Sequence, residues 1–153
     1  MKTELEIFRN GREFILEIVN KLSNDQLNEV PEGFTGNIIW HLGHMVVTHR
    51  GLVYQLGGHR SGMEKEFLLK YVRGAKPEEK TSDEEIEFIK RRLIEQADEF
   101  ETDLEAAAFP DEYREFKTMT GYTIKDKAGA IAFSNFHQAT HVGYILCLRR
   151  LVE

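Results

Sequence analysis

The sequence predicts an all-α fold, a four-helix bundle with a long connection between its second and third helices. Three observations lead to this prediction. Apolar residues recur every three or four positions in four long segments, as they do on the buried face of a helix. We find neither the alternating apolar and polar pattern of strands nor an internal repeat. A chain of 153 residues is long enough for one domain, residues 1–153, with a continuous core.

The first helix is expected from Glu4 to about Lys21, where apolar residues lie at helical spacing among charged ones. Ser23, followed three residues later by Gln26, has the pattern of a capping box. A short helical turn is therefore expected after Ser23, and Pro31 should stop it.

The second long helix is expected from Asn37 to Leu56, a segment almost free of charged residues. Such a helix should be covered on most of its sides. Gly57 and Gly58 should end it. The connection that follows, residues 57–81, should hold a short helix from Met63 to Val72 and either cross over the bundle or cover one of its ends.

The third long helix should begin at a capping box made by Ser82 and Glu85. It carries a heptad-like apolar seam on a highly charged rod, so its back should be exposed, and Pro110 should close it. A polar loop then leads to the last helix, expected from Thr123 to Leu151, where Thr123 with Asp126 should form the cap.

The last helix carries two histidines, His137 and His141, which lie on the same face because they are four residues apart. They interrupt an apolar stripe, and a buried imidazole needs a partner for each ring nitrogen. His44 holds a similar central place on the second helix, between Trp40 and Val47. We therefore take His44, His137 and His141 as candidate ligands of a divalent metal ion that keeps an open coordination position.

Other interpretations of these residues remain open. His137 and His141 are alternatively core polar residues bonded to carbonyl or hydroxyl groups. Position 138 is Gln, so the chain lacks the glutamate base of His-Glu-x-x-His proteases. His41 is a hydrogen-bond partner of a ligand, an alternative ligand, or a cap on the pocket mouth. Tyr144, one turn beyond His141, either orients a bound group or packs.

Three further residues are expected to have no part in this site. His49 points away from the seam of the second helix, and His59 lies in a glycine-rich loop, so both should pack or lie at the surface. Cys147 is the only cysteine, which excludes an intramolecular disulfide and fits a reducing compartment. It should pack as a small apolar residue.

Charge and composition restrict the partners. Lys and Arg number 20 and Asp and Glu 26, so the net charge is −6, and we find no basic patch strong enough to bind nucleic acid. Because no apolar run reaches the length of a membrane span and the N-terminus lacks a signal-peptide core, we expect a cytoplasmic protein without a membrane partner. The uncharged second helix should leave an apolar back exposed, which predicts a homodimer.

Two segments, Asn37–His44 (NIIWHLGH) and Asn135–Ile145 (NFHQATHVGYI), resemble the DinB/YfiT-like family in its DinB-like branch. That branch has W-x-L-G-H on the second helix and H-x-x-x-H-x-G on the fourth. The resemblance runs over essentially the whole chain. It implies a four-helix bundle, usually a homodimer, with a divalent ion, most often zinc or nickel, on His44, His137 and His141.

The resemblance also suggests a function. Characterised relatives include S-transferases and isomerases that use a low-molecular-weight thiol such as bacillithiol or mycothiol, and many members have no assigned reaction. The expected function is thus that of a metal-dependent transferase or hydrolase in which the ion activates a thiolate or water toward a small-molecule substrate. The alternative is a non-catalytic bundle or dimeric interaction protein whose metal is structural or absent.

Overall fold

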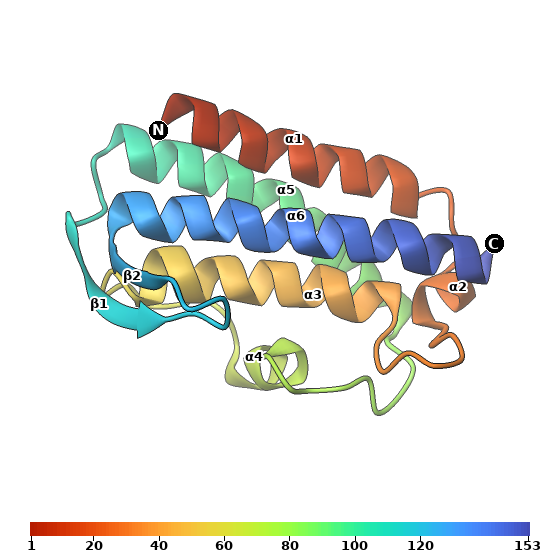
Figure 1. Ribbon diagram of the computed structural model, residues 1–153. Coiled ribbons are helices and arrows are strands. Elements are labelled where there is room, and N and C mark those ends of the chain that lie inside the picture. Colours follow the sequence, from red (N-terminus) through yellow and green to blue (C-terminus); the bar gives the residue numbers. More distant parts are fainter.

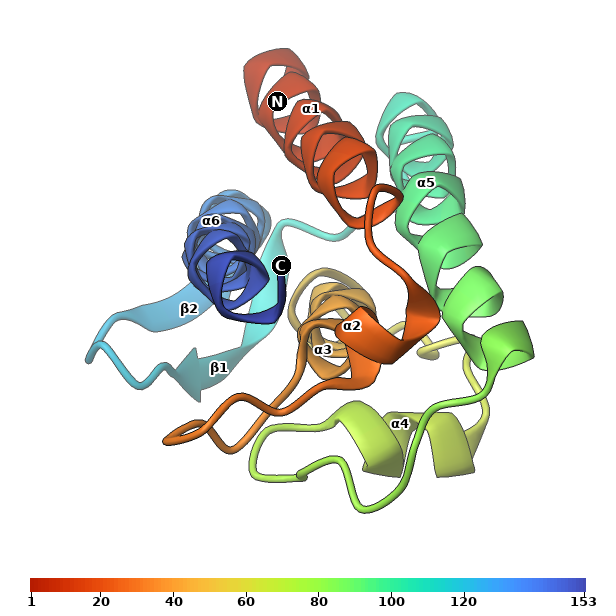
Figure 2. The same cartoon turned by 90° about the vertical axis from the view of Figure 1, so that its right-hand side faces the viewer.

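The computed structural model describes all 153 residues and is mostly helical, with one small two-stranded sheet. Four long helical segments lie side by side (Figures 1 and 2). They are α1 (Lys2–Val19), α3 (Ile38–His49) with its continuation η1 (Arg50–Gln55), α5 (Asp83–Glu105) and α6 (Lys127–Val152). Both α1 and α3 pack against α5 and α6, and the core between the segments consists of one cluster of 18 buried apolar residues and two smaller clusters. The prediction of a mostly helical chain is confirmed.

The two short helices also lie where the sequence predicted them. The first, α2 (Asn24–Asn28), has the expected capping box, in which the Ser23 hydroxyl accepts from the Gln26 N–H and the Gln26 side chain accepts from the Ser23 N–H. The second, α4 (Lys65–Tyr71), lies within the long connection and packs beneath α3 (Figure 2). The connection therefore covers α3 rather than only joining two helices.

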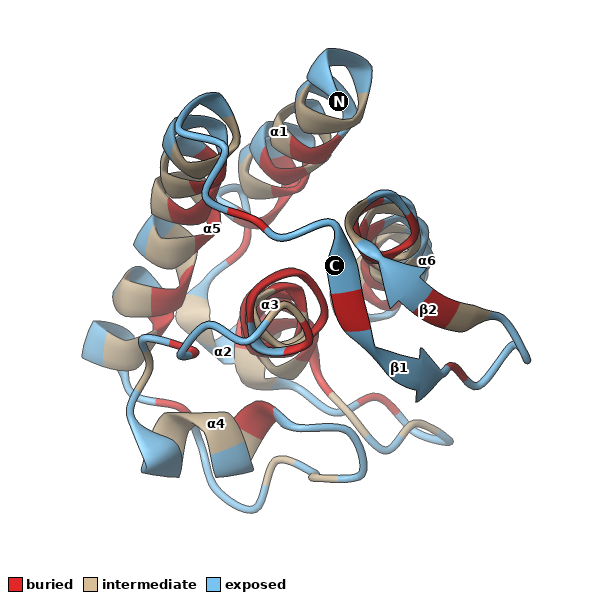
Figure 3. Ribbon diagram, turned by 90° about the vertical axis from the view of Figure 1, so that its left-hand side faces the viewer, coloured by how far each residue is buried: buried red, intermediate tan, exposed pale blue.

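The most enclosed helix is α3, which lies at the centre of the burial view (Figure 3). Every residue from Ile38 to Arg50 is buried or half-buried, because α2, α4, α5 and α6 all pack against this helix. The expectation that this uncharged helix is covered on most sides is therefore met within one chain. The apolar back from which we predicted a homodimer does not exist on α3, and the homodimer itself stays a prediction.

The segment η1 continues α3 as a wider, π-helical turn. The N–H of Leu56 donates to the carbonyl of Gly51 at 3.1 Å, and the N–H of His59 donates to the carbonyl of Tyr54 at 2.9 Å. Both bonds span five residues, where an α-helical bond spans four. Such widened turns are frequent beside functional sites, and this one lines a pocket described below.

A β-hairpin stands where the sequence predicted a polar loop, so the all-α prediction is wrong here. Strands β1 (Glu112–Lys117) and β2 (Thr123–Asp126) pair antiparallel, with Phe116 opposite Ile124. The alternation of apolar and polar residues that would indicate a strand is weak in β1, because only Tyr113 of its six residues is buried and the others are exposed. The hairpin packs on the start of α6 (Figure 1).

Because β2 occupies the expected first turn, the last helix begins at Lys127 and not at Thr123. Its N-cap is Asp126, whose carboxylate accepts from the N–H of Gly129 at 2.7 Å. Near the other end of α6, Cys147 is exposed, contrary to the expectation that it packs in the core. None of the helices combines the length and the apolar character that crossing a membrane requires.

Candidate metal centre

Three histidines from two neighbouring helices meet inside the molecule. His44 comes from α3, and His137 and His141 come from successive turns of α6, which packs against α3. One ring nitrogen of each residue lies within 4.8 Å of the corresponding nitrogens of the other two. The rings are 4.5 to 5.1 Å apart between centroids. The expected convergence of these three residues is therefore present.

The two histidines of α6 have the closest contact. Their Nε2 atoms are 3.2 Å apart. Two nitrogens bound to one tetrahedral zinc ion, at Zn–N distances of about 2.0–2.1 Å, would be separated by about 3.4 Å. The spacing of His137 and His141 therefore suits two ligands of one ion, and a ring nitrogen of His44 lies within 4.8 Å of theirs.

The ring of His44 is held in one orientation. Its Nδ1 donates to the carbonyl oxygen of Tyr71 at 2.7 Å, which leaves the lone pair on Nε2. Nε2 faces the hydroxyl of Thr48 at 3.2 Å, and the indole of Trp40 stacks on the ring at 4.8 Å with an interplanar angle of 10°. A carbonyl that accepts the proton of one ring nitrogen and frees the other is a common partner of metal-binding histidines.

His41 is the partner of His141 rather than a member of the three-histidine group. Its Nδ1 lies 2.8 Å from Nδ1 of His141, so one of these atoms donates to the other. When Nε2 of His141 keeps its lone pair for the site, Nδ1 of His141 carries the proton and His41 accepts it. Of the three roles left open for His41, this geometry supports the hydrogen-bond partner of a ligand.

All four imidazoles are neutral near neutral pH. Burial, and after it repulsion by the charged form of His44, lowers the pKa of His41 and of His137 to about 4. Burial, with the charges of the three surrounding histidines, lowers the pKa of His141 to about 2. Burial also lowers the pKa of His44. Protons therefore do not compete for the lone pairs that a metal ion would use.

Gln138 faces away from the three histidines, toward α1. It is buried, its Oε1 accepts from Nε of Arg12 at 3.1 Å, and its Nε2 donates to the carbonyl of Phe8 at 3.0 Å. This residue therefore joins α6 to α1. It stands where a zinc protease of the His-Glu-x-x-His type carries its base, and it supplies no base to this site.

The remaining aromatic candidates lie at the edge of the site or outside it. Tyr144 is 47% exposed and packs on His41 with ring centroids 4.8 Å apart, so it supports the partner of a ligand and not the ligands themselves. His49 is buried, with Nδ1 3.2 Å from the hydroxyl of Ser134, and has the expected packing role. His59 is exposed on the loop after η1.

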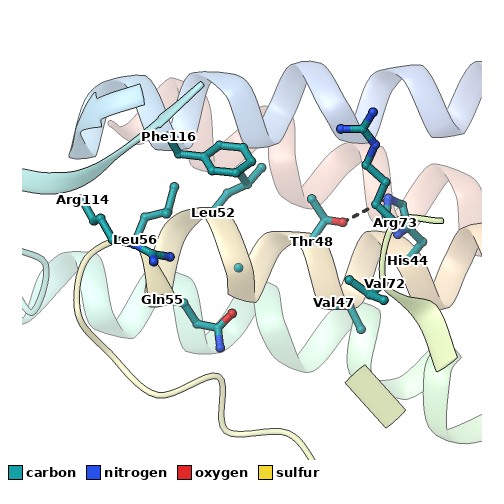
Figure 4. Close-up of a pocket in the computed structure, with 11 residues that line it drawn as sticks. His44, Val47, Thr48, Leu52, Gln55, Leu56, Val72, Arg73, Arg114 and Phe116 are labelled. Atoms are coloured by element: carbon teal, nitrogen blue, oxygen red, sulfur yellow. Dashed lines mark hydrogen bonds between the residues drawn. The ribbon is translucent and has the colours of Figure 1, made fainter. Parts of the chain in front are cut away.

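One of the three histidines, His44, also lines a pocket of about 270 Å³ (Figure 4). Three of its other lining residues, Thr48, Arg73 and Arg114, were not identified from the sequence. Thr48 was detectable, since it lies one helical turn after His44. Nothing in the spacing of Arg73 and Arg114 relates them to the histidines, because they come from the long connection and from β1.

The fold and the site together define a helical protein with three inward-facing imidazoles beside a small pocket. The sequence matches the DinB superfamily over residues 7–145, and the chain belongs to this superfamily. The resemblance seen in the two histidine motifs is thus confirmed. No curated protein matches the sequence.

Proposed function

We propose that the chain is a cytoplasmic, metal-dependent enzyme built on a four-helix bundle, with one divalent cation held by His44, His137 and His141. Zinc and nickel are the expected ions. The reaction is a transfer to a low-molecular-weight thiol such as bacillithiol, or a hydrolysis. The observation that carries the proposal is the meeting of three neutral imidazoles beside a pocket of small-molecule size.

The residues present fit such an ion. Three neutral nitrogen ligands leave at least one coordination position for another group, as in catalytic zinc sites. A bound divalent cation lowers the pKa of a coordinated thiol or water and so supplies a nucleophile near neutral pH. Around it, the Tyr71 carbonyl and His41 set the tautomers of His44 and His141, and Trp40 limits the rotation of His44.

The alternative function, a bundle whose metal is only structural, has less support. One cluster of 18 buried apolar residues packs between the helices without any contribution from a metal ion. A domain with a core of this size should stay helical after chelation and only melt at a lower temperature. Loss of most of the helical circular dichroism on treatment with a chelator would favour the structural role instead.

Metal binding is tested with His137→Ala and, as a matched control, with His59→Ala outside the site. Purified wild-type protein and His59→Ala should each hold one divalent ion per chain, and His137→Ala should bind it at least about tenfold more weakly. Trp40 is the only tryptophan and stacks on His44, so quenching of its fluorescence by added nickel should report the binding. Equal metal content in His137→Ala and the wild type would contradict the ligand assignment.

The reaction class is tested by screening zinc- and nickel-loaded protein with thiols and electrophiles. A transferase should consume the thiol and the electrophile in equal amounts and lose this activity with the metal. A hydrolase should act without the thiol. An absence of both activities in metal-loaded protein would favour the non-catalytic alternative.

A further inference from the structure

The pocket beside the three histidines is elongated and has a mixed lining. His44 and Arg73 lie at one end and Arg114 lies at the other (Figure 4). Its volume of about 270 Å³ is close to the lower limit of the usual range of ligand sites, which suits a small molecule. Apolar side chains complete the wall between the two ends: Val47, Leu52, Leu56, Val72 and Phe116.

The two arginines in this lining have no acidic partner. Some other arginines of the chain, such as Arg9 and Arg92, are paired with carboxylates. Arg73 and Arg114 make no ion pair and no side-chain hydrogen bond, although the chain has an excess of acidic residues, and no Asp or Glu lines the pocket. The pocket is therefore a positive region on a negatively charged protein.

The charge near the histidines is also uncompensated. The three candidate ligands are neutral, so a divalent cation bound there would keep its full charge. Arg73 adds to it, because this residue lines the same end of the pocket as His44 (Figure 4). An anionic ligand would balance these positive charges, whereas a neutral ligand would leave them without a counter-charge in the pocket.

Arg114 places a second positive charge at the end of the pocket away from His44 (Figure 4). Arg114 and Phe116 are two residues apart on β1 and both line the pocket, while Glu115 between them does not. The hairpin therefore presents a guanidinium and an aromatic ring to the end of the pocket away from His44. A guanidinium is a fork of donors that binds carboxylate or phosphate oxygens in pairs.

We propose that Arg73 and Arg114 select a small substrate or cosubstrate that carries oxyanion groups, and hold it with its reacting atom toward His44. The apolar wall contacts the body of the molecule between its charged ends. This inference rests on the proposed function, since it names the class of molecule that the same site takes. The arginines, however, can be tested without a metal ion.

The first experiment measures the binding of succinate to metal-free protein by titration calorimetry. The double variant Arg73→Gln/Arg114→Gln should bind succinate at least about tenfold more weakly than the wild type. Arg150→Gln, which alters an exposed arginine without an ion pair at the end of α6, should bind succinate as the wild type does. Equal affinities for the wild type and the double variant would overturn the proposal, whether or not the protein binds a metal.

The second arm uses zinc-loaded protein and two thiols, mercaptosuccinate and thioglycerol, with the zinc content checked after each titration. The wild type should prefer the acidic thiol by about tenfold or more, and the double variant should lose this preference while its affinity for thioglycerol is unchanged. A wild type that binds the two thiols equally would contradict the inference. Failure of zinc to bind at all would count against the proposed function, and the succinate arm would still decide on the arginines.

Inorganic phosphate separates the two sources of an oxyanion. If the arginines recognise any oxyanion, phosphate should compete with succinate in the wild type. If they recognise carboxylates, succinate should bind with the same affinity in its presence. Both results support an anionic substrate, and each names a different class of molecule for the activity screen.

Discussion

At the scale of single residues, His44 and His141 each use Nδ1 in a hydrogen bond, which leaves Nε2 of each ring as the candidate ligand atom. His44 gives its Nδ1 proton to a backbone carbonyl, whereas His141 shares a proton with the side chain of His41. The carbonyl of Tyr71 cannot be removed by substitution, but His41 can. The role of a ligand's partner can therefore be measured at His41.

We predict that His41→Phe weakens metal binding by about 10- to 100-fold, because Nδ1 of His141 then has no acceptor inside the site. His41→Asn should recover part of the affinity, since its carbonyl oxygen replaces Nδ1 of His41 as acceptor. Tyr144→Phe, which keeps the ring that packs on His41, is the control and should bind metal normally. Competition with a chelator of known affinity measures all three, and an unchanged affinity in His41→Phe would exclude this role.

A second residue-scale prediction concerns pH and His49. Burial, and then the charges of Arg12 and Arg50, hold the pKa of His49 well below its usual range. The unfolded chain therefore takes up this proton first, near pH 6.5, so the contribution of His49 to stability is complete above that pH and is lost as the pH falls. The loss approaches about 1.4 kcal/mol per pH unit.

Urea unfolding at pH 7 and pH 5 measures this effect. His49→Gln keeps a polar group near Ser134 but cannot be protonated, so it should lose less stability than the wild type over this interval. His59→Gln, at an exposed position, should follow the wild type. Equal losses in the wild type and His49→Gln would show that His49 does not contribute to acid sensitivity.

At the scale of elements, the contact between α3 and α4 supports the site. Gly43 permits it, because a Cβ at this position would overlap the ring of Tyr71. The same Tyr71 supplies the carbonyl that accepts from His44. The packing of a short helix in the long connection is therefore coupled to the orientation of a candidate ligand.

Gly43→Ala should therefore destabilise the protein and weaken metal binding, although alanine favours a helix over glycine by about 1 kcal/mol. The added Cβ would lie within 2.6 Å of three ring carbons of Tyr71, so the tyrosine ring has to move away. We expect the backbone carbonyl of Tyr71 to move with the ring. Gly143→Ala on α6 is the matched control, since a Cβ at this position would have no neighbour within 4 Å, and it should stabilise by about 0.5–1 kcal/mol. Thermal melts and metal titration test both variants, and a stabilised Gly43→Ala would contradict the packing argument.

At the scale of the whole molecule, the outer face of α6 is the surface best suited to a second copy of the chain. No charged residue occurs between Lys127 and Arg149, yet Phe136, Tyr144 and Leu151 are exposed. Small residues, Ala132, Ala139 and Gly143, are exposed on the same helix. The homodimer stays a prediction, and its expected surface moves from α3 to α6.

We expect a dimer at micromolar concentration in sedimentation experiments, because burying such a face removes apolar surface from water. Phe136→Glu should shift the protein to the monomer. Met119→Glu, which alters a still more exposed apolar residue on the hairpin loop, should leave the dimer intact. A monomeric wild type at this concentration would exclude the homodimer.

The sequence by itself determined the long helices and the shared face of His137 and His141. Helical hydrogen bonds join residues four apart, so the apolar spacing and the capping residues at Ser23 and Ser82 carry the information locally. Strand β1 was not predicted because a strand depends on a partner that is not local in the sequence. Its hydrogen bonds are made with β2, and its residues are mostly exposed.

Only the tertiary structure decided which side chains meet. His41 and His141 are 100 residues apart in the chain, and Arg73 and Arg114 reach the pocket from a connection and a hairpin. Helical periodicity gives the face on which a residue lies, but not the neighbour that the face meets or the register of that contact. Those depend on how whole helices pack, which is a property of the complete set of side chains in the core.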